Sequence, residues 1–298
     1  MLPDERLTPA DVEGLTLGPV VTRPDPERIE AFVAATGDDP ERWAGAAPPG
    51  YAAALLFRVA GGFLWDPRLS DERRTLLHVD QEFGFRRPIP VGVDLAVTGT
   101  VQRVRRRGEA SFVTFVAEVR DGADVVLGSR STFLMSPEAA SDPGPDPGEP
   151  PAVERGITEV PEAVTLDRLS SGVSLAKSAS REDLVRYAAA TGDLNPIHWD
   201  HDAARDAGLP GVVVHGLLLH SWMSQLASVA SREEQPIVFM KTRFRQPLRP
   251  AQQATVTAGL KELAHDGKDA ALALAVESGG ETLVSAAATV RLHTDVTR

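Results

Sequence analysis

The sequence contains no cysteine among its 298 residues. Disulfide bonds, cysteine nucleophiles and thiolate metal sites are therefore excluded. Aromatic residues make up only 5% of the chain, and no apolar run approaches the roughly 20 residues that cross a membrane. The N-terminus, Met1-Leu-Pro-Asp-Glu-Arg, lacks the basic and apolar regions of a secretory signal peptide. We therefore expect a cytoplasmic protein that has no membrane partner.

Basic residues are outnumbered, with 31 Lys and Arg against 42 Asp and Glu and a formal net charge of -11. A charge of this sign opposes general binding to nucleic-acid phosphates, so no nucleic-acid partner is expected. The composition, 42% hydrophobic and 24% charged, is that of an ordinary globular protein. The chain is long enough for one large or two medium domains.

A segment rich in proline and glycine, residues 136–151, divides the chain nearly in half. Repeated proline and glycine without apolar anchors can continue neither a helix nor a sheet. The sequence therefore predicts two domains, 1–135 and 152–298, joined by this linker.

The second half of the chain repeats the first. Three pairs of segments correspond in the same order at nearly one offset, namely 155, 159 and 158 residues (192 − 37, 247 − 88 and 280 − 122). The pairs are Phe32-Val-Ala-Ala-Thr-Gly-Asp with Tyr187-Ala-Ala-Ala-Thr-Gly-Asp, Phe85-Arg-Arg-Pro with Phe244-Arg-Gln-Pro, and Asp121-Gly122 with Gly279-Gly280. An internal duplication of this kind determines the fold more strongly than local propensity does.

Each half shows one helix, a longer helix and then several strands. In the first half, a helix over 26–36 is capped by Asp25 and stopped by Gly37, and a mostly buried helix spans 51–65. Residues 76–135 are rich in β-branched residues and contain a hairpin turn. The pattern predicts an α+β fold in which each sheet faces one dominant helix.

The most informative stretch begins after a helix that Ser180 caps and Gly192 ends. Pro196 keeps the preceding residue out of the helical region, so the loop from Asp193 should be tight and rigid. Such a loop can hold the carboxylate of Asp193 and the imidazole of His198 toward one small volume. That geometry is what positioning a water molecule requires.

An apolar helix then begins near Gly216. Its first turn has amide N–H groups without internal partners, and glycine lets a ligand approach the backbone closely. These donors could stabilise a developing oxyanion, and losing one such donor costs other enzymes about 3–4 kcal/mol. Gly216, His220 and Ser224 follow at intervals of four residues and therefore share one face of the helix.

Separately these signals are weak, because a Gly-Asp pair after a helix is usually a cap and a lone histidine is usually structural. Their combination is specific. The pattern Tyr-x3-Thr-Gly-Asp-x-Asn-Pro-x-His, followed by Val-Val-His-Gly, resembles the signature of the (R)-specific enoyl-CoA hydratases. These proteins, also called hydratase 2 or MaoC-like dehydratases, adopt the hotdog fold. The duplication extends the resemblance to the double-hotdog members of the family.

The resemblance implies a role for each matching residue. Asp193 and His198 would bind and activate the catalytic water, and Gly216 would supply an oxyanion-hole amide. Asn195 would order the loop, and Ser224 would lie near the catalytic pair. The implied reaction is the reversible hydration of a trans-2-enoyl thioester to a (3R)-3-hydroxyacyl thioester, carried on coenzyme A or an acyl-carrier protein. It would use no metal and no other cofactor.

The first half departs from this signature. It keeps Asp38, but Arg42 stands where the second half has His198, and no asparagine precedes the proline. We therefore expect a non-catalytic hotdog. Gly61-Gly62 should weaken its long helix, which would help this half to accommodate the acyl chain.

The sequence is compatible with several alternatives. The histidines between 198 and 220 fit no familiar metal-ligand spacing. The basic clusters Arg103–Arg107 and Lys241–Arg245 are either solvated strand edges or contacts for coenzyme A phosphates or an acidic carrier protein. A hotdog thioesterase and a non-catalytic acyl-thioester-binding protein are the competing functions. Association of two chains into a homodimer is also open.

Overall fold

The computed structural model describes residues 6–148, 156, 159–160, 162–231, 233–265 and 267–292. The helices are α1 (Pro26–Thr36), α2 (Ala52–Leu64), α3 (Leu166–Ser170), α4 (Arg181–Thr191), α5 (His201–Asp206) and α6 (Gly216–Ala227). The strands of the first half are β1 (Thr16–Thr22), β2 (Thr75–Phe85), β3 (Leu95–Arg107), β4 (Ala110–Asp121) and β5 (Asp124–Ser136). Those of the second half are β6 (Val173–Lys177), β7 (Ile237–Phe244), β8 (Ala254–Leu263), β9 (Asp269–Ser278) and β10 (Glu281–Arg291).

All ten strands form one antiparallel sheet in the order β1-β3-β4-β5-β2-β7-β10-β9-β8-β6. Counted from the outer edge of the sheet, the first half has the order β1-β3-β4-β5-β2 and the second half has the order β6-β8-β9-β10-β7. In both halves this is the first, third, fourth, fifth and second strand along the chain. The halves join where β2 pairs with β7, from Asp80 opposite Arg243 to Gly84 opposite Phe239. The internal duplication predicted from the sequence is therefore confirmed by identical topology.

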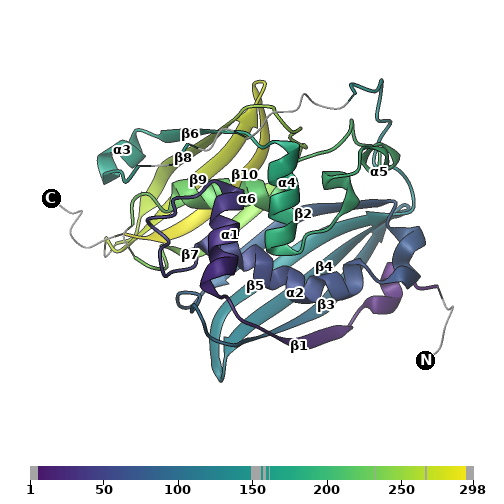
Figure 1. The fold of residues 1–298 in the computed structure, drawn as a ribbon, viewed down its shortest axis with the longest axis horizontal. Coiled ribbons are helices and arrows are strands. Elements are labelled where there is room, and N and C mark those ends of the chain that lie inside the picture. The colour runs from purple at the N-terminus through teal and green to yellow at the C-terminus, as the bar shows by residue number, and fades with distance from the viewer. Residues whose placement is uncertain are drawn as a thin grey trace.

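One long apolar helix lies against each half of this curved sheet (Figure 1). Helix α2 contacts β1, β3 and β4, whereas α6 contacts all five strands of the second half. Both helices consist mainly of buried apolar residues, because each one is enclosed by its own half-sheet. The predicted α+β double hotdog is confirmed.

Helix α2 runs unbroken across Gly61 and Gly62. A Cβ atom on Gly61 would lie 3.3 Å from the indole of Trp65, and one on Gly62 would lie 3.3 Å from Leu17. The two glycines thus make room for neighbouring side chains, and the helix does not open at this point.

The shorter helices α1 and α4 end as the sequence predicts. Their caps Gly37 and Gly192 are left-handed, with φ of 59° and 80°. Asp25 accepts a hydrogen bond from the Arg28 amide, and Ser180 forms a capping box with Asp183. Because α1 and α4 pack side by side (Figure 1), the loops that follow them occupy equivalent places in the two halves.

The predicted linker begins at Ser136, which is the last residue of β5. Residues 137–148 form neither helix nor strand and lie along α5. The Ala140 amide donates to the Ala207 carbonyl at 2.9 Å, and a guanidinium nitrogen of Arg205 donates to the Gly144 carbonyl at 2.8 Å. The remaining linker residues, 149–151, and the first four residues of the predicted second domain lie outside the described residues.

No helix in the described part of the chain is long and apolar enough to cross a membrane.

Candidate active site

The loop after α4 carries Asp193 and leads into a short 3₁₀ turn, Pro196–His198, which ends at the second predicted catalytic residue. The Asn195 side chain orders this loop, because its Oδ1 accepts from the Ile197 amide at 3.4 Å and its Nδ2 donates to the Leu76 carbonyl at 2.9 Å. Leu76 belongs to β2, so this asparagine ties the loop of the second half to the first half. Its predicted role in ordering the loop agrees with these contacts.

His198 is held by the segment that leads into α6. Its Nδ1 donates to the Val213 carbonyl at 2.8 Å, and the Val213 amide donates back to the Ile197 carbonyl at 3.1 Å. Because a carbonyl can only accept, Nδ1 carries the proton and Nε2 carries a lone pair. Burial lowers the pKa of His198 to about 4, although the bond to Val213 opposes this shift. The imidazole is therefore a neutral hydrogen-bond acceptor near pH 7.

Asp193 is the other predicted catalytic residue, beside His198. Its side chain is only 7% exposed, as is that of His198. Burial raises the pKa of Asp193 to about 7, and a hydrogen bond from the Asn195 backbone partly offsets the shift. A carboxyl group whose pKa lies near neutrality is well matched to accept and return a proton.

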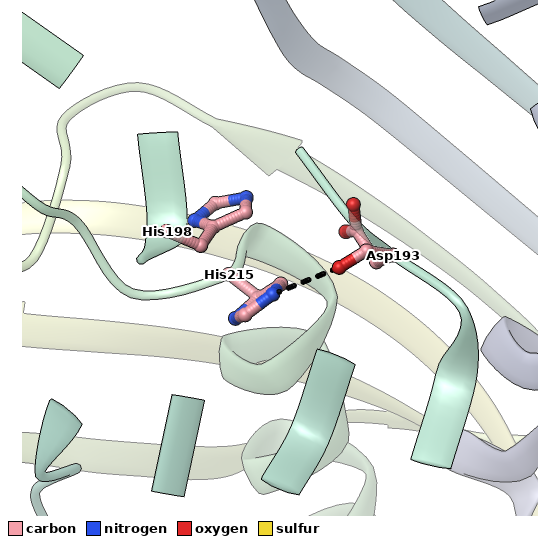
Figure 2. A group of neighbouring side chains, drawn as sticks. All are labelled: Asp193, His198 and His215. Carbon is pink, nitrogen blue, oxygen red and sulfur yellow. Dashed lines mark hydrogen bonds between the residues drawn. The ribbon is translucent and has the colours of Figure 1, made fainter. Parts of the chain in front are cut away.

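His215 lies beside both Asp193 and His198, although the sequence analysis assigned it no role beyond its place before Gly216. Its Nε2 donates to the backbone carbonyl of Asp193 at 3.3 Å, as Figure 2 shows. Its ring stacks on that of His198, with centroids 3.8 Å apart and planes 23° apart. On its other side the ring of Tyr187 lies at 4.9 Å. His215 thus fixes the positions of both predicted catalytic residues.

Asp193, His198 and His215 offer donor atoms that lie within 4.8 Å of one another. The stacking of the two imidazoles does not suit metal binding. A histidine lone pair lies in the plane of its ring, and zinc sits about 2.0–2.1 Å from the nitrogen along that direction. Two nearly parallel rings 3.8 Å apart direct their lone pairs along separate planes, which do not meet at one such ion.

Gly216 is the first residue of α6, and no side chain caps this end of the helix. A Cβ atom on Gly216 would lie 3.1 Å from the ring of Phe244. The absence of a side chain therefore lets Phe244 pack against the helix end. The first-turn amides remain without an intrahelical acceptor, as they do in any α-helix.

Asp193, His198 and Gly216 line one cavity of about 250 Å³. Its walls come from both halves of the chain and are mostly apolar. The first half contributes α2 and the strands β2 and β5 through Phe57, Leu64, Trp65, Leu76, Leu77, His78, Val79 and Phe133. None of these residues was predicted to line the site, since only the folded sheet brings them next to the signature loop.

Other predicted residues lie outside this cavity. Ser224 is not among its lining residues, and its hydroxyl donates to the Ser221 carbonyl at 2.8 Å. Among the basic clusters, Lys241 pairs with Glu82 at 2.8 Å and Arg243 with Asp80 at 3.7 Å across the β2–β7 junction. Arg245 does line the cavity.

The equivalent place in the first half holds a different cluster. Asp38 is buried and accepts from the Asp39 amide at 2.8 Å. The buried Lys177 donates to the neighbouring Gly37 carbonyl at 2.7 Å, and Arg42 donates to the Ser231 carbonyl at 3.0 Å. Arg42 thus connects the two halves at the position that His198 occupies in the second half.

Comparisons with known proteins agree with this architecture. Residues 152–277 match the family model described as MaoC like domain. The 3-hydroxyacyl-thioester dehydratase X of Mycobacterium tuberculosis is 28% identical over 246 residues, which cover 82% of this chain and 78% of that protein. Residues 152–277 thus form a MaoC-like dehydratase domain, and the class of activity of the chain is that of a hydro-lyase.

Solved structures show the same fold. A MaoC-like dehydratase superposes with a TM-score of 0.78 at 18% identity, covering 96% of this chain and 100% of that one. A Mycobacterium tuberculosis protein described as a double hotdog gives a TM-score of 0.66 at 13% identity, covering 96% and 98% of the two chains.

Proposed function

We propose that this protein catalyses the reversible hydration of trans-2-enoyl thioesters to (3R)-3-hydroxyacyl thioesters. The observation that carries the proposal is the pairing of a buried carboxyl, with its pKa near 7, and a neutral imidazole whose free nitrogen accepts. Both groups line one apolar cavity with the end of α6. Such a pair suits proton transfer to and from a single water molecule.

In the proposed reaction, Nε2 of His198 accepts a hydrogen bond from one water proton. The Asp193 carboxylate removes the other proton as the water oxygen bonds to the β-carbon. The electron pair of the double bond moves toward the α-carbon and the thioester carbonyl. Asp193 then returns its proton to the α-carbon, so the enzyme regains its starting state. The reverse sequence dehydrates the 3-hydroxyacyl thioester.

The developing negative charge on the thioester oxygen would lie at the amide of Gly216. Oriented backbone donors at a helix N-terminus act strongly on such charge, since removing one comparable donor slows other enzymes by about 10²–10³. His215 would act as a positioning residue, because it contacts the Asp193 backbone and the His198 ring.

The acyl chain would extend from the catalytic pair toward the first half. That side of the cavity is formed by α2, β2 and β5, with aromatic and aliphatic walls. In this proposal the first half is a non-catalytic hotdog, because Arg42 there contacts Ser231 and no histidine accompanies Asp38. Arg245 at the cavity wall would lie near the carrier, coenzyme A or an acyl-carrier protein.

Product analysis tests the reaction directly. The purified chain, treated with a chelator, is mixed with crotonyl-CoA and with trans-2-octenoyl-CoA, and the products are resolved by chiral chromatography. We expect (3R)-3-hydroxyacyl-CoA at a rate that the chelator does not change. Free coenzyme A as the product would indicate a thioesterase instead, and (3S)-3-hydroxyacyl-CoA would overturn the stereochemical assignment.

A further inference from the structure

The acyl side of the cavity is not wholly apolar. Two residues on its wall, His78 and Trp65, each have a ring nitrogen that is shielded from solvent and has no hydrogen-bond partner within the described part of the chain. Buried polar atoms in proteins are nearly always paired, and leaving one unpaired costs about 1–3 kcal/mol. Two such atoms in one ligand cavity indicate that the ligand itself provides a polar partner.

His78 faces the cavity because strand β2 is irregular at this point. The pairing of β2 with β5 shifts between His78 and Asp80, which leaves Val79 as an extra residue. A bulge of this kind turns side chains out of strict alternation. As a result the consecutive residues 76–79 all line the cavity.

Two aromatic rings fix the place of His78 along the cavity. The ring of Phe133 lies 4.6 Å away and that of Phe244 lies 5.2 Å away, between centroids. Phe244 also lies next to Gly216, since a Cβ atom built there would be 3.1 Å from its ring, and the thioester oxygen is proposed to bind at this glycine. His78 therefore lies beside this point, on the wall that the first half contributes, where the acyl chain would pass.

The hydrogen-bonding character of His78 follows from its surroundings. Nε2 of this imidazole has no hydrogen-bond partner in the described part of the chain. Burial and the nearby His220 lower the pKa of His78 to about 3. The ring is thus neutral, and its unpaired Nε2 can donate or accept a hydrogen bond, depending on the tautomer. Trp65 can only donate from Nε1.

A hydroxyl group can satisfy both kinds of atom, since it donates one hydrogen bond and accepts others. We propose that the acyl groups taken by this site carry a hydroxyl beyond the two reacting carbons, which forms a hydrogen bond with Nε2 of His78. This inference rests on the proposed hydratase function and narrows its substrate class to hydroxylated acyl thioesters. Trp65 adds a donor on the same wall.

The test compares trans-2-octenoyl-CoA with analogues that carry one hydroxyl group at carbon 5, 6, 7 or 8. For each compound, kcat/KM is measured by loss of the enoyl-thioester absorbance with the full-length chain. In a wholly apolar tunnel every hydroxyl would lower kcat/KM. We expect at least one position to raise it tenfold or more over the unsubstituted substrate.

The variants His78→Phe and His78→Gln then test the residue. His78→Phe should reduce the preference for the hydroxylated substrate at least tenfold, whereas His78→Gln, which keeps an acceptor of similar reach, should retain part of it. Phe133→Leu is the matched control, since it alters the same wall without changing a polar atom and should affect both substrates alike. Thermal melts of each variant establish that it is folded, and Trp65→Phe provides a second, independent change on this wall.

The outcomes separate the two proposals. If octenoyl-CoA is hydrated but no hydroxylated analogue is preferred, the inference about His78 is wrong while the proposed function stands. The same conclusion follows if His78→Phe leaves the preference unchanged. If the wild-type chain hydrates none of the substrates, the proposed function itself is contradicted.

Discussion

Asp193 and His198 differ from ordinary aspartate and histidine residues for the same physical reason. Burial disfavours the charged form of each, and so it raises the pKa of Asp193 to about 7 and lowers that of His198 to about 4. Both groups are therefore mostly neutral between about pH 4 and pH 7. In enzymes, burial that shifts the pKa values of an acid and a base in this way allows proton transfer near physiological pH.

Ionisation of the Asp193 carboxyl group should lower the free energy of unfolding. Between about pH 4 and pH 7 the unfolded chain has released this proton while the folded chain retains it, so stability falls as the pH rises. We predict that Asp193→Asn raises the free energy of unfolding at pH 8 by up to about 4 kcal/mol, and that the gain shrinks toward pH 4. Denaturant titrations at a series of pH values measure it. The exposed Asp202→Asn is the control and should change stability by less than about 0.5 kcal/mol; an equal gain at every pH would contradict the account.

The same residue should set the pH dependence of catalysis. Because the proposed mechanism starts from the Asp193 carboxylate in both directions, kcat/KM for hydration and for dehydration should rise as the pH increases through about 7. The measurement is kcat/KM with crotonyl-CoA from pH 5 to pH 9. If kcat/KM shows no inflection between pH 6 and pH 8, Asp193 is not the group that transfers the proton.

The sequence predicted the individual residues of the signature but not the side chains that surround them. Asp193, His198 and Asn195 could be identified because a short rigid loop carries all three. His215 acts through the stacking of its ring on that of His198, and no spacing rule reports such a contact. His78 and Trp65 are more than a hundred residues from the loop, and no motif in the sequence connects either of them with it.

Gly216, at the N-terminal end of helix α6, has to meet two requirements. Gly216 must leave its amide accessible, and it must also admit the ring of Phe244, which lies 3.1 Å from where a Cβ would be. Alanine favours helices more than glycine does, so a loss of activity on substitution would arise from the contact and not from the helix.

We predict that Gly216→Ala folds normally but lowers kcat/KM at least tenfold, because the methyl group displaces Phe244 into the cavity and shifts the amide. Steady-state kinetics with crotonyl-CoA measure the effect, and circular dichroism reports the fold. Gly259→Ala in β8 is the matched control, since a Cβ atom there meets nothing within 4 Å. Equal activities of the two variants would show that this helix end takes no part in the reaction.

The elements themselves were largely predictable. Both helix caps, Gly37 and Gly192, and the turns at Asp121-Gly122 and Gly279-Gly280 followed from local sequence, since turn chemistry depends on a few neighbouring residues. The continuity of α2 through Gly61 and Gly62 did not. Tertiary packing against Trp65 and Leu17 offsets the low helix propensity of the two glycines.

For the whole molecule, the junction between the halves is a short pairing of β2 with β7 reinforced by ion pairs. The cavity spans this junction, so its walls depend on the two halves remaining in register. The sequence predicted the duplication, because the repeated motifs recur at a constant offset. The sequence could not show that both halves contribute walls to one cavity, since that follows from the order in which the strands pair.

Reversing the charge on one side of this junction should destabilise the molecule. We predict that Lys241→Glu lowers stability by about 1 kcal/mol, a shift in Tm of about 2 °C for a chain of this size, because two carboxylates would then face each other at Glu82. Combining it with Glu82→Lys should restore most of the loss, and thermal melts of the three variants measure both effects. If the losses of the two single variants simply add, this pair does not stabilise the junction.

Of the two equivalent loops, only the one in the second half is proposed to be catalytic. The most direct test measures hydration of crotonyl-CoA by Asp193→Asn and His198→Ala, with Asp38→Asn as the counterpart in the first half. We predict that each change in the second half lowers kcat by about 10²–10⁴-fold, the usual contribution of a positioned acid or base. Asp38→Asn should retain the wild-type rate. A wild-type rate in Asp193→Asn, or a comparable loss in Asp38→Asn, would contradict the account.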